Sequence, residues 1–467
     1  MHYVSTRGAA PALGFADALL AGLARDGGLY APFSIPQLTP EAIRGLRGVP
    51  YPEAAARVMA PFVAEDFDEA EVRTLTAAAY AGFGHAAAAP IAQIDVNLFT
   101  LELFHGPTLA FKDFAMQFLG QAMNRVLHER GERATIIGAT SGDTGAAAIE
   151  AFAGRSEVEI FILYPQGRVS EAQRRQMTTV NRPNVHALAI EGAFDDCQRI
   201  VKELFGDLVF RDDMRLTGVN SINWARIVAQ IVYYFVGAVA LGAPERPVSF
   251  AVPTGNFGDV LAGYYAKRMG LPVERLIIAT NENDILARAL ASGRYAPKGV
   301  KATQSPSMDI QVSSNFERLL FEASGRDSDT VVARMGDLER ESSFTIPAPA
   351  LERIRADFDA FRVDEDACAE EMGRVYRESG MIVDPHSAVG VHAARTALAA
   401  KPATPVIALA TAHPAKFQGA VERATGLRPA LPERLKDLMD RKEKIVVLPN
   451  DRRAVADFVR RTTRVVA

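Results

Sequence analysis

Short apolar runs alternate with helix-length segments beyond about residue 95, and this alternation limits the possible folds more than any other feature of the chain. A turn rich in glycine, serine or threonine follows several of the runs, and residues with helical spacing come next. Strands that alternate with helices form parallel sheets whose two faces are covered by helices. The expected strands are 134–138, 158–164, 185–190, 216–219, 248–252, 276–280 and 406–410, and the expected helices are 145–153, 169–177, 194–205, 222–241, 259–269, 285–291 and 414–424.

Seven strand–helix units are too many for one small sheet, so we expect an α/β fold of two parallel-sheet lobes with a cleft between them. A mainly helical N-terminal region should precede the lobes, because 14–24 and 52–60 have apolar residues three or four positions apart. The basic segment 436–444 is expected to be a solvent-exposed helix face. The expected boundaries are 1–95 for the helical region, 96–245 for the first lobe and 246–467 for the second lobe.

The composition argues against several classes of partner. A formal net charge of −4 gives no general attraction to nucleic acid or to an anionic membrane. Cys197 and Cys368 are far apart and form no metal-binding or disulfide pattern, and the first residues lack the apolar stretch of a secretory signal. The longest apolar run, 227–243, contains Gln230 and is expected to be a buried helix. We therefore expect a cytoplasmic protein, a monomer or small homo-oligomer, with no nucleic-acid or membrane partner.

Ligands of open α/β sheets bind beyond the carboxyl ends of the strands, so the turns at these ends are the candidate sites. The turn 253–259 contains Gly255 and Gly258 and leads into a helix whose free N–H groups attract an anion. It matches neither the P-loop nor the dinucleotide fingerprint, and a plain tight turn is the alternative. The turn 139–145 carries three hydroxyls and a carboxylate, which suit either an anion or ordinary helix capping.

Lys112 is the third candidate, because it lies between Phe111 and Phe114 where a helix is expected to begin. Apolar neighbours and the positive end of a helix both lower the pKa of an amine, which makes it a nucleophile or a base. A lysine that extends along an amphipathic helix toward solvent is the alternative. Lysines are also rare, since the chain has only ten among its 52 basic residues.

Thr411, before Pro414, is the fourth candidate and either caps a helix or bonds a ligand ring. The histidines show no convincing metal spacing, so no metal is expected, and no G-x-S-x-G motif supports a serine hydrolase. An amine for an aldehyde, an anion-binding turn and a hydroxyl near a ring are together the requirements of pyridoxal 5'-phosphate. The residues therefore favour this cofactor, held in the cleft.

Motifs along almost the whole length resemble the threonine synthases, in particular the longer bacterial and fungal class of this pyridoxal-phosphate family with the tryptophan-synthase-β fold. The resemblance implies that Lys112, in the first lobe, forms the Schiff base with the cofactor. It implies that the second lobe holds the cofactor phosphate on Gly255, Asn256, Phe257, Gly258 and Asp259, and that Thr411 faces the pyridine nitrogen. Ser387 stands where a threonine is expected and keeps the hydroxyl. The matching segments are 3–8, 26–30, 104–114, 139–145, 220–223, 253–259, 313–318, 384–390 and 411–417.

The resemblance also implies an activity, the conversion of O-phospho-L-homoserine and water to L-threonine and phosphate, which ends threonine biosynthesis. A phospho-lyase that releases 2-oxobutyrate and ammonia, and a non-enzymatic nucleotide-binding regulator, are the alternatives. Candidates for the substrate carboxylate and the cofactor surroundings are Thr140, Ser141, Asp143 and Thr144. Candidates for the substrate phosphate are Ser314, Asn315 and Arg318, because an arginine fork suits a phosphate dianion.

Overall fold

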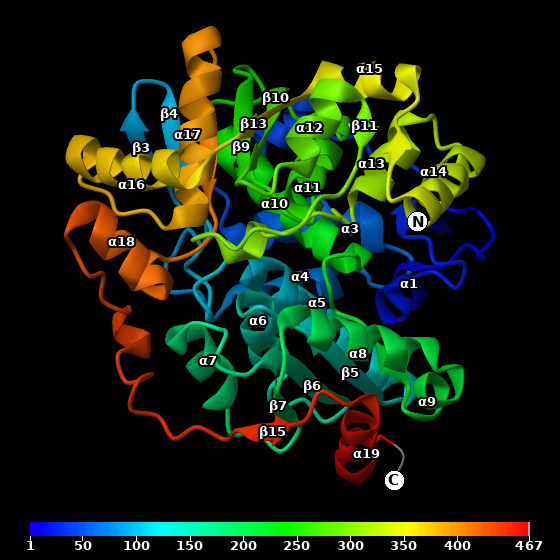
Figure 1. Ribbon diagram of the computed structural model, residues 1–467. Coiled ribbons are helices and arrows are strands. Elements are labelled where there is room, and N and C mark those ends of the chain that lie inside the picture. The colour runs from blue at the N-terminus through cyan, green and yellow to red at the C-terminus, as the bar shows by residue number, and fades with distance from the viewer. Residues whose placement is uncertain (466–467) are drawn as a thin grey trace.

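The computed structural model describes residues 1–465, and within them the two main sheets lie toward opposite ends of the molecule (Figure 1). The large sheet has six strands in the order β13-β10-β9-β14-β4-β3, and the small sheet has five in the order β15-β7-β6-β5-β8. The small sheet pairs in parallel, and so does the large sheet apart from its β3–β4 edge. The expected α/β class with two parallel-sheet lobes is confirmed.

Strands β9 and β14 of the large sheet and β6 and β7 of the small sheet are buried along their whole length, as is usual where helices cover both faces. The strands of the large sheet are β3 (Ile91–Asp95), β4 (Leu98–Glu102), β9 (Val248–Pro253), β10 (Val273–Thr280), β13 (Phe358–Arg362) and β14 (Val406–Ala410). The strands of the small sheet are β5 (Ala134–Ala139), β6 (Val158–Pro165), β7 (Val185–Ile190), β8 (Leu216–Thr217) and β15 (Val446–Leu448).

The expected lobe boundaries need a correction at both ends. The β3–β4 pair joins the large sheet, where β4 lies beside β14, whereas β15 returns from the end of the chain to pair with β7 in the small sheet. The boundaries at 95/96 and 245/246 therefore do not divide the sheets. A strand pattern locates a strand along the chain but not its partner, because the hydrogen bonds are made with residues that are remote in sequence.

The N-terminal region is mainly helical and is anchored to the core of the molecule. The Tyr3 ring packs 5.8 Å from the ring of Trp224, and its hydroxyl donates to the Phe62 carbonyl at 2.6 Å. Asp68 and Glu71 form a reciprocal capping box at the start of α4, which explains why that helix begins there. The elements are β1 (Tyr3–Ser5), α1 (Phe15–Ala21), β2 (Tyr30–Pro32), α2 (Pro40–Arg44), α3 (Tyr51–Val63) and α4 (Glu69–Tyr80).

Two central helices connect the lobes. Helix α5 (Lys112–Arg130) packs against α6 (Asp143–Phe152) of the small lobe and against α10 (Trp224–Ala240), which packs in turn against α11 (Gly258–Arg268) of the large lobe. The apolar run expected as a buried helix forms most of α10, whose side chains are almost all buried. Across residues 1–465, no helix combines the length and the apolar character needed to cross a membrane.

The other elements cover the sheets or form the rim of the large lobe (Figure 1). In the small lobe these are α7 (Glu171–Thr178), α8 (Phe194–Gly206), α9 (Leu208–Asp213) and α19 (Arg452–Thr462). In the large lobe and the segment after it they are α12 (Ile285–Ser292), β11 (Arg294–Tyr295), η1 (Pro306–Met308), α13 (Phe316–Ala323), α14 (Ser328–Glu341), β12 (Phe344–Thr345), α15 (Ala348–Asp357), α16 (Glu365–Ser379), α17 (Pro385–Ala400), η2 (Pro414–Phe417), α18 (Gln418–Thr425) and η3 (Glu433–Leu435).

One local expectation is wrong. Segment 436–444 is not a helix, because it is tied to the small lobe: the N–H of Lys444 donates to the Thr178 carbonyl at 2.7 Å, and Glu443 accepts from Arg174 at 2.9 Å. The helix expected over 414–424 is present, and its first turn is a 3₁₀ turn that leads directly into α18.

Close packing of α5 on α6 should be sensitive to one added methyl group. A Cβ on Gly120 would lie 2.6 Å from the Ala151 carbonyl oxygen, so Gly120→Ala should destabilise the protein by about 1–3 kcal/mol. Gly419→Ala is the matched control, because its Cβ would meet only Arg423 at 3.5 Å. Urea unfolding monitored by circular dichroism should show a lower midpoint for the first variant only, and equal midpoints would contradict this packing.

Candidate active site

Lys112 is the first residue of α5, and its amine lies where side chains of the two lobes meet. The residue is 8% exposed, and its Nζ is 4.8 Å from the centre of the Phe111 ring and 3.5 Å from Oδ2 of Asp143. Burial lowers the pKa of the amine; Asp143 acts against this change, and the cations Lys416 and Arg226 add to it. Such an amine is more nucleophilic and more easily deprotonated than an exposed lysine.

The turn before α5 is fixed by the carboxylate of Asp113. This carboxylate accepts from the N–H of Thr108 at 2.8 Å and from the Thr108 hydroxyl at 2.6 Å. Burial raises the pKa of Asp113 to about 6, although these hydrogen bonds act in the opposite direction. The N–H of Phe111 donates to the Thr411 carbonyl at 2.9 Å, so the end of β14 lies directly beside the turn that carries Lys112.

Three side chains share the carboxylate of Asp143, at the start of α6. Its Oδ1 is 2.6 Å from Nζ of Lys416 and accepts from Gln173 at 2.8 Å, while its Oδ2 faces Lys112. Burial acts to raise the pKa of Asp143, but the two ammonium groups outweigh it and hold the pKa below its usual range. The negatively charged side chain of Asp143 would repel a substrate carboxylate. Within this residue, only the backbone N–H is therefore suited to the predicted role of binding that carboxylate. The sequence interpretation missed Lys416.

The turn that contains the other candidates for the substrate carboxylate is organised by Thr140. Its hydroxyl accepts from two N–H groups of the same turn, at 3.0 and 2.9 Å, so it is already engaged. Ser141 and Thr144 are half-buried. Within the described residues, the N–H groups of Ser141, Asp143 and Thr144 make no hydrogen bond. These three free donors at the start of a helix form an anion site, which we call the α6 cup.

A second anion site lies where β9 leads into α11, and we call it the α11 cup. It consists of the backbone N–H groups of residues 255–259, which have no hydrogen-bond partner in the described part of the chain. Phe257 has a φ of 65°, a left-handed conformation that turns successive N–H groups toward one side. Because the N-terminus of α11 also carries a partial positive charge, this cup suits a phosphate group.

The loop before α13 supports the α11 cup through hydrogen bonds to the backbone carbonyls of the cup residues. The Ser313 hydroxyl donates to the Gly255 carbonyl, and both the backbone and the side-chain nitrogen of Asn315 donate to the Asn256 carbonyl at 3.1 Å. A Cβ on Gly255 would lie 2.9 Å from the Ser307 carbonyl oxygen, so only glycine fits this turn without displacing the loop. Asn315 therefore supports the cup.

The side chain of Asp259 points away from the α11 cup. Its Oδ1 accepts from the hydroxyls of Tyr233 at 2.6 Å and Tyr234 at 2.8 Å, both on α10. Burial raises the pKa of this carboxyl to about 6, although the two hydroxyls act against the change. Asp259 therefore contributes its backbone N–H to the cup, and its carboxyl connects α11 to α10.

The assignment of Arg318 to the substrate phosphate is corrected by the structure. Arg318 is fully buried, and its guanidinium donates to the carbonyls of Tyr30 and Ile222 at 2.9 and 2.6 Å and to the side chain of Asn315. These contacts join three segments of the fold and leave the guanidinium no surface for a ligand. Ser314 is exposed, and no side-chain hydrogen bond connects it to the cups within residues 1–465.

Arg226, in the first turn of α10, has the character expected of a phosphate ligand. The residue is 3% exposed, its Nε has no hydrogen-bond partner, and its Nη1 makes a long 3.4 Å contact with the Val219 carbonyl. Among the described residues no carboxylate pairs with it. Burial lowers the pKa of Arg226 to about 10, and its charge in turn lowers the pKa of Lys112. A buried cation with free donors requires an anion.

The end of β14 presents the hydroxyl of Thr411. Its backbone N–H is held by the Ser387 hydroxyl at 3.1 Å, and Ser387 donates to Asp384. The alternative in which Thr411 caps the following helical turn is wrong, because the cap is His413, whose ring accepts from the N–H of Ala415 at 3.1 Å. The Thr411 hydroxyl makes no hydrogen bond within the described residues and remains free for a ligand.

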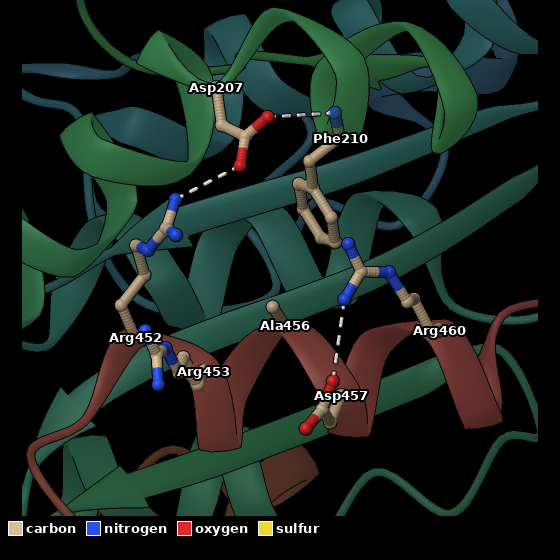
Figure 2. A pocket seen from close by; sticks show the side chains of 7 residues that line it. All are labelled: Asp207, Phe210, Arg452, Arg453, Ala456, Asp457 and Arg460. Atoms are coloured by element: carbon tan, nitrogen blue, oxygen red, sulfur yellow. Dashed lines mark hydrogen bonds and ion pairs between the residues drawn. The ribbon is translucent and has the colours of Figure 1, made fainter.

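A groove at the far end of the small lobe is a weaker candidate (Figure 2). Its volume is about 270 Å³, and its charges pair with each other, since Arg452 contacts Asp207 at 3.0 Å and Arg460 contacts Asp457 at 3.3 Å. It contains none of the predicted site residues. Across residues 1–465, His, Cys, Asp and Glu form no group of three or more that could hold a metal ion.

Comparisons with known proteins point to one family. Three family models match the chain: "Threonine synthase N terminus" over residues 2–80, "Pyridoxal-phosphate dependent enzyme" over residues 86–412 and "Threonine synthase, C-terminal" over residues 387–459. Threonine synthase of Pseudomonas aeruginosa is 52% identical, with 98% of each chain covered. Threonine synthase of Saccharomyces cerevisiae is 42% identical, with 95% of this chain and 94% of the relative covered.

Solved structures agree with these matches. A pyridoxal-phosphate-bound threonine synthase from Brucella melitensis superposes with a TM-score of 0.96 at 58% identity, covering 99% of this chain and 100% of the other. Threonine synthase from Escherichia coli superposes with a TM-score of 0.84 at 32% identity, with the same coverage. The chain therefore belongs to the threonine synthase family of pyridoxal-phosphate-dependent enzymes.

Proposed function

We propose that the site around Lys112 converts O-phospho-L-homoserine and water to L-threonine and phosphate, with Lys112 as both the attachment point of the cofactor and the base. The observation that carries this proposal is the grouping of a buried amine of lowered pKa with two cups of free N–H groups. Pyridoxal phosphate, when bound through its aldehyde, supplies an electron sink for the carbon next to the substrate amine.

The residues fit this cofactor. The α11 cup offers unpaired N–H groups to its phosphate, and Lys112 offers an amine to its aldehyde. The free hydroxyl of Thr411 suits the pyridine nitrogen, because a neutral partner does not force that nitrogen to be protonated.

Each remaining group has a role that follows from its chemistry. The α6 cup binds the substrate carboxylate through the N–H groups of Ser141, Asp143 and Thr144. Arg226 binds the substrate phosphate as it leaves, since it is a buried cation with free donors. The Lys112 Nζ takes the proton from the substrate Cα, gives it up again and then takes one from Cβ, so that the phosphate can depart from Cγ with the electrons of the C–O bond. The proton from Cβ is returned to Cγ. Water then adds its hydroxyl at Cβ, and Cα regains a proton.

We also propose a cellular location, a class of partner and an oligomeric state for the protein. The net charge of −4 and the two buried, unpaired cysteines support a cytoplasmic enzyme that acts on a small molecule and binds no nucleic acid. We propose a monomer or a small homo-oligomer.

Borohydride reduction of the cofactor-loaded protein, followed by peptide mapping, should place the pyridoxyl group on Lys112. Lys416 provides an internal control, because its amine is also buried and lies beside the same carboxylate. A label on Lys416 or on an exposed lysine would contradict the assignment of Lys112.

Arg226→Gln should raise the KM for O-phospho-L-homoserine about 10- to 100-fold, because it removes a charge-assisted hydrogen bond worth about 1.5–3 kcal/mol. The cofactor affinity, measured by fluorescence titration, should change little. A variant that loses cofactor affinity while keeping its KM would instead place Arg226 on the cofactor phosphate.

Thr411→Asp should keep the cofactor on Lys112 and lose threonine formation, because a carboxylate favours the protonated pyridine nitrogen. Thr411→Ser is the matched control and should retain activity, since it preserves the hydroxyl. Threonine output is the measurement, and wild-type turnover in the Asp variant would remove Thr411 from the cofactor site.

A further inference from the structure

Lys416 has no role in the proposed reaction, although it is a fully buried charged side chain near Lys112. Its side chain is 0% exposed, and its Nζ contacts Oδ1 of Asp143 at 2.6 Å and donates to the Thr108 carbonyl at 2.9 Å. Both contacts are made inside the protein. The surroundings of Lys416 therefore suit a residue that holds other groups in place more than one that binds a ligand.

The contacts of Lys416 join the parts that carry the chemistry. Lys416 follows β14 of the large sheet, whereas Asp143 begins α6 of the small lobe, so the ion pair spans the two lobes. Thr108 lies in the turn that leads to Lys112 and is held by Asp113. One ammonium group thus fixes both the carboxylate that faces Lys112 and the turn that carries Lys112.

We propose that Lys416 is a positioning residue for Lys112: it holds Asp143 in place across the lobes and divides the charge of that carboxylate between two ammonium groups. This inference rests on the proposed function of Lys112.

The division of the Asp143 charge between Lys112 and Lys416 matters because Lys112 must lose and regain a proton. If Asp143 paired with Lys112 alone, the ion pair would keep Lys112 as an ammonium group, which neither attacks an aldehyde nor accepts a proton. With Lys416 present, Lys112 can lose its proton and leave a neutral Lys416–Asp143 pair. When the amine later takes the proton from the substrate Cα, the new ammonium group lies within reach of Oδ2 of Asp143. The proton moves from carbon to Nζ, and no other group changes its protonation.

Other charges face the same amine and stay constant in the test. Arg226 on α10 lowers the pKa of Lys112, and Asp259 on α11 and Asp113 on α5 are buried carboxyls nearby. Since none of these residues is changed, a shift between variants reports the Lys416–Asp143 pair.

The test measures how readily the Lys112 amine reacts as a function of pH. Cofactor-free protein is mixed with pyridoxal phosphate at a series of pH values and trapped with borohydride, and the label on the Lys112 peptide is quantified. Lys416→Met should move the midpoint of labelling upward by about one pH unit, because Lys112 loses a neighbouring cation and gains the whole of Asp143. The acid limb of kcat should move in the same direction. Lys401→Met, at an exposed pair with Glu274, is the control and should leave both unchanged.

A second variant shows whether the effect passes through Asp143. Lys416→Met combined with Asp143→Asn removes both buried charges, so no unpaired ion is left to oppose folding. Its labelling midpoint should fall below that of Lys416→Met, since the carboxylate that retains the Lys112 proton is gone. A midpoint as high as that of Lys416→Met would overturn the proposal.

The remaining outcomes separate this inference from the proposed function. An unchanged midpoint in Lys416→Met, with wild-type label on Lys112, would overturn the role of Lys416 alone. A raised KM for O-phospho-L-homoserine without any pH shift would also overturn it, by making Lys416 a substrate ligand. If borohydride trapping of the wild-type protein placed the label on a lysine other than Lys112, the proposed function itself would be overturned.

Discussion

The ion pair between Asp143 and Lys416 connects the two lobes directly beside the amine of Lys112. The two residues come from different lobes, and both are almost fully buried. Removing two charges from water has a large desolvation cost, so a pair of this kind is weak evidence for stability. Its effect is better understood as electrostatic and local, because it joins residues of the two lobes beside Lys112 and keeps a carboxylate ionised next to that amine.

The N-termini of α6 and α11 supply most of the other groups that can bind a ligand at this site. The α6 cup and the α11 cup both use backbone N–H groups that an α-helix cannot satisfy by itself, and the two helices belong to different lobes. Arg226 adds a buried side-chain charge near the same amine, whereas the cups are formed by the backbone. A site of this design can hold two anionic groups at separate places and keep a lysine of lowered pKa near both.

The sequence located the turns well, because glycines, hydroxyls and Lys112 at strand ends are local signals. The hydrogen-bond and ion-pair partners of the site residues could not be predicted in this way, because they are remote in sequence. Arg318 ends one motif segment and Arg226 closely follows another, yet Arg318 donates to carbonyls of the fold and Arg226 keeps a free Nε. Only the packing of distant segments separates the two. Lys416 could have been noticed, since lysines are rare and it lies in a matching motif, but its partner Asp143 is remote in sequence. The same reason explains the return of β15 to the small sheet.

The site around Lys112 is proposed to add water to the carbon chain of a phosphorylated amino acid. Chiral amino-acid analysis and phosphate assay of the cofactor-loaded enzyme, given O-phospho-L-homoserine as the sole substrate, test it directly. We expect one L-threonine for each phosphate released. Release of 2-oxobutyrate and ammonia in place of threonine would contradict it.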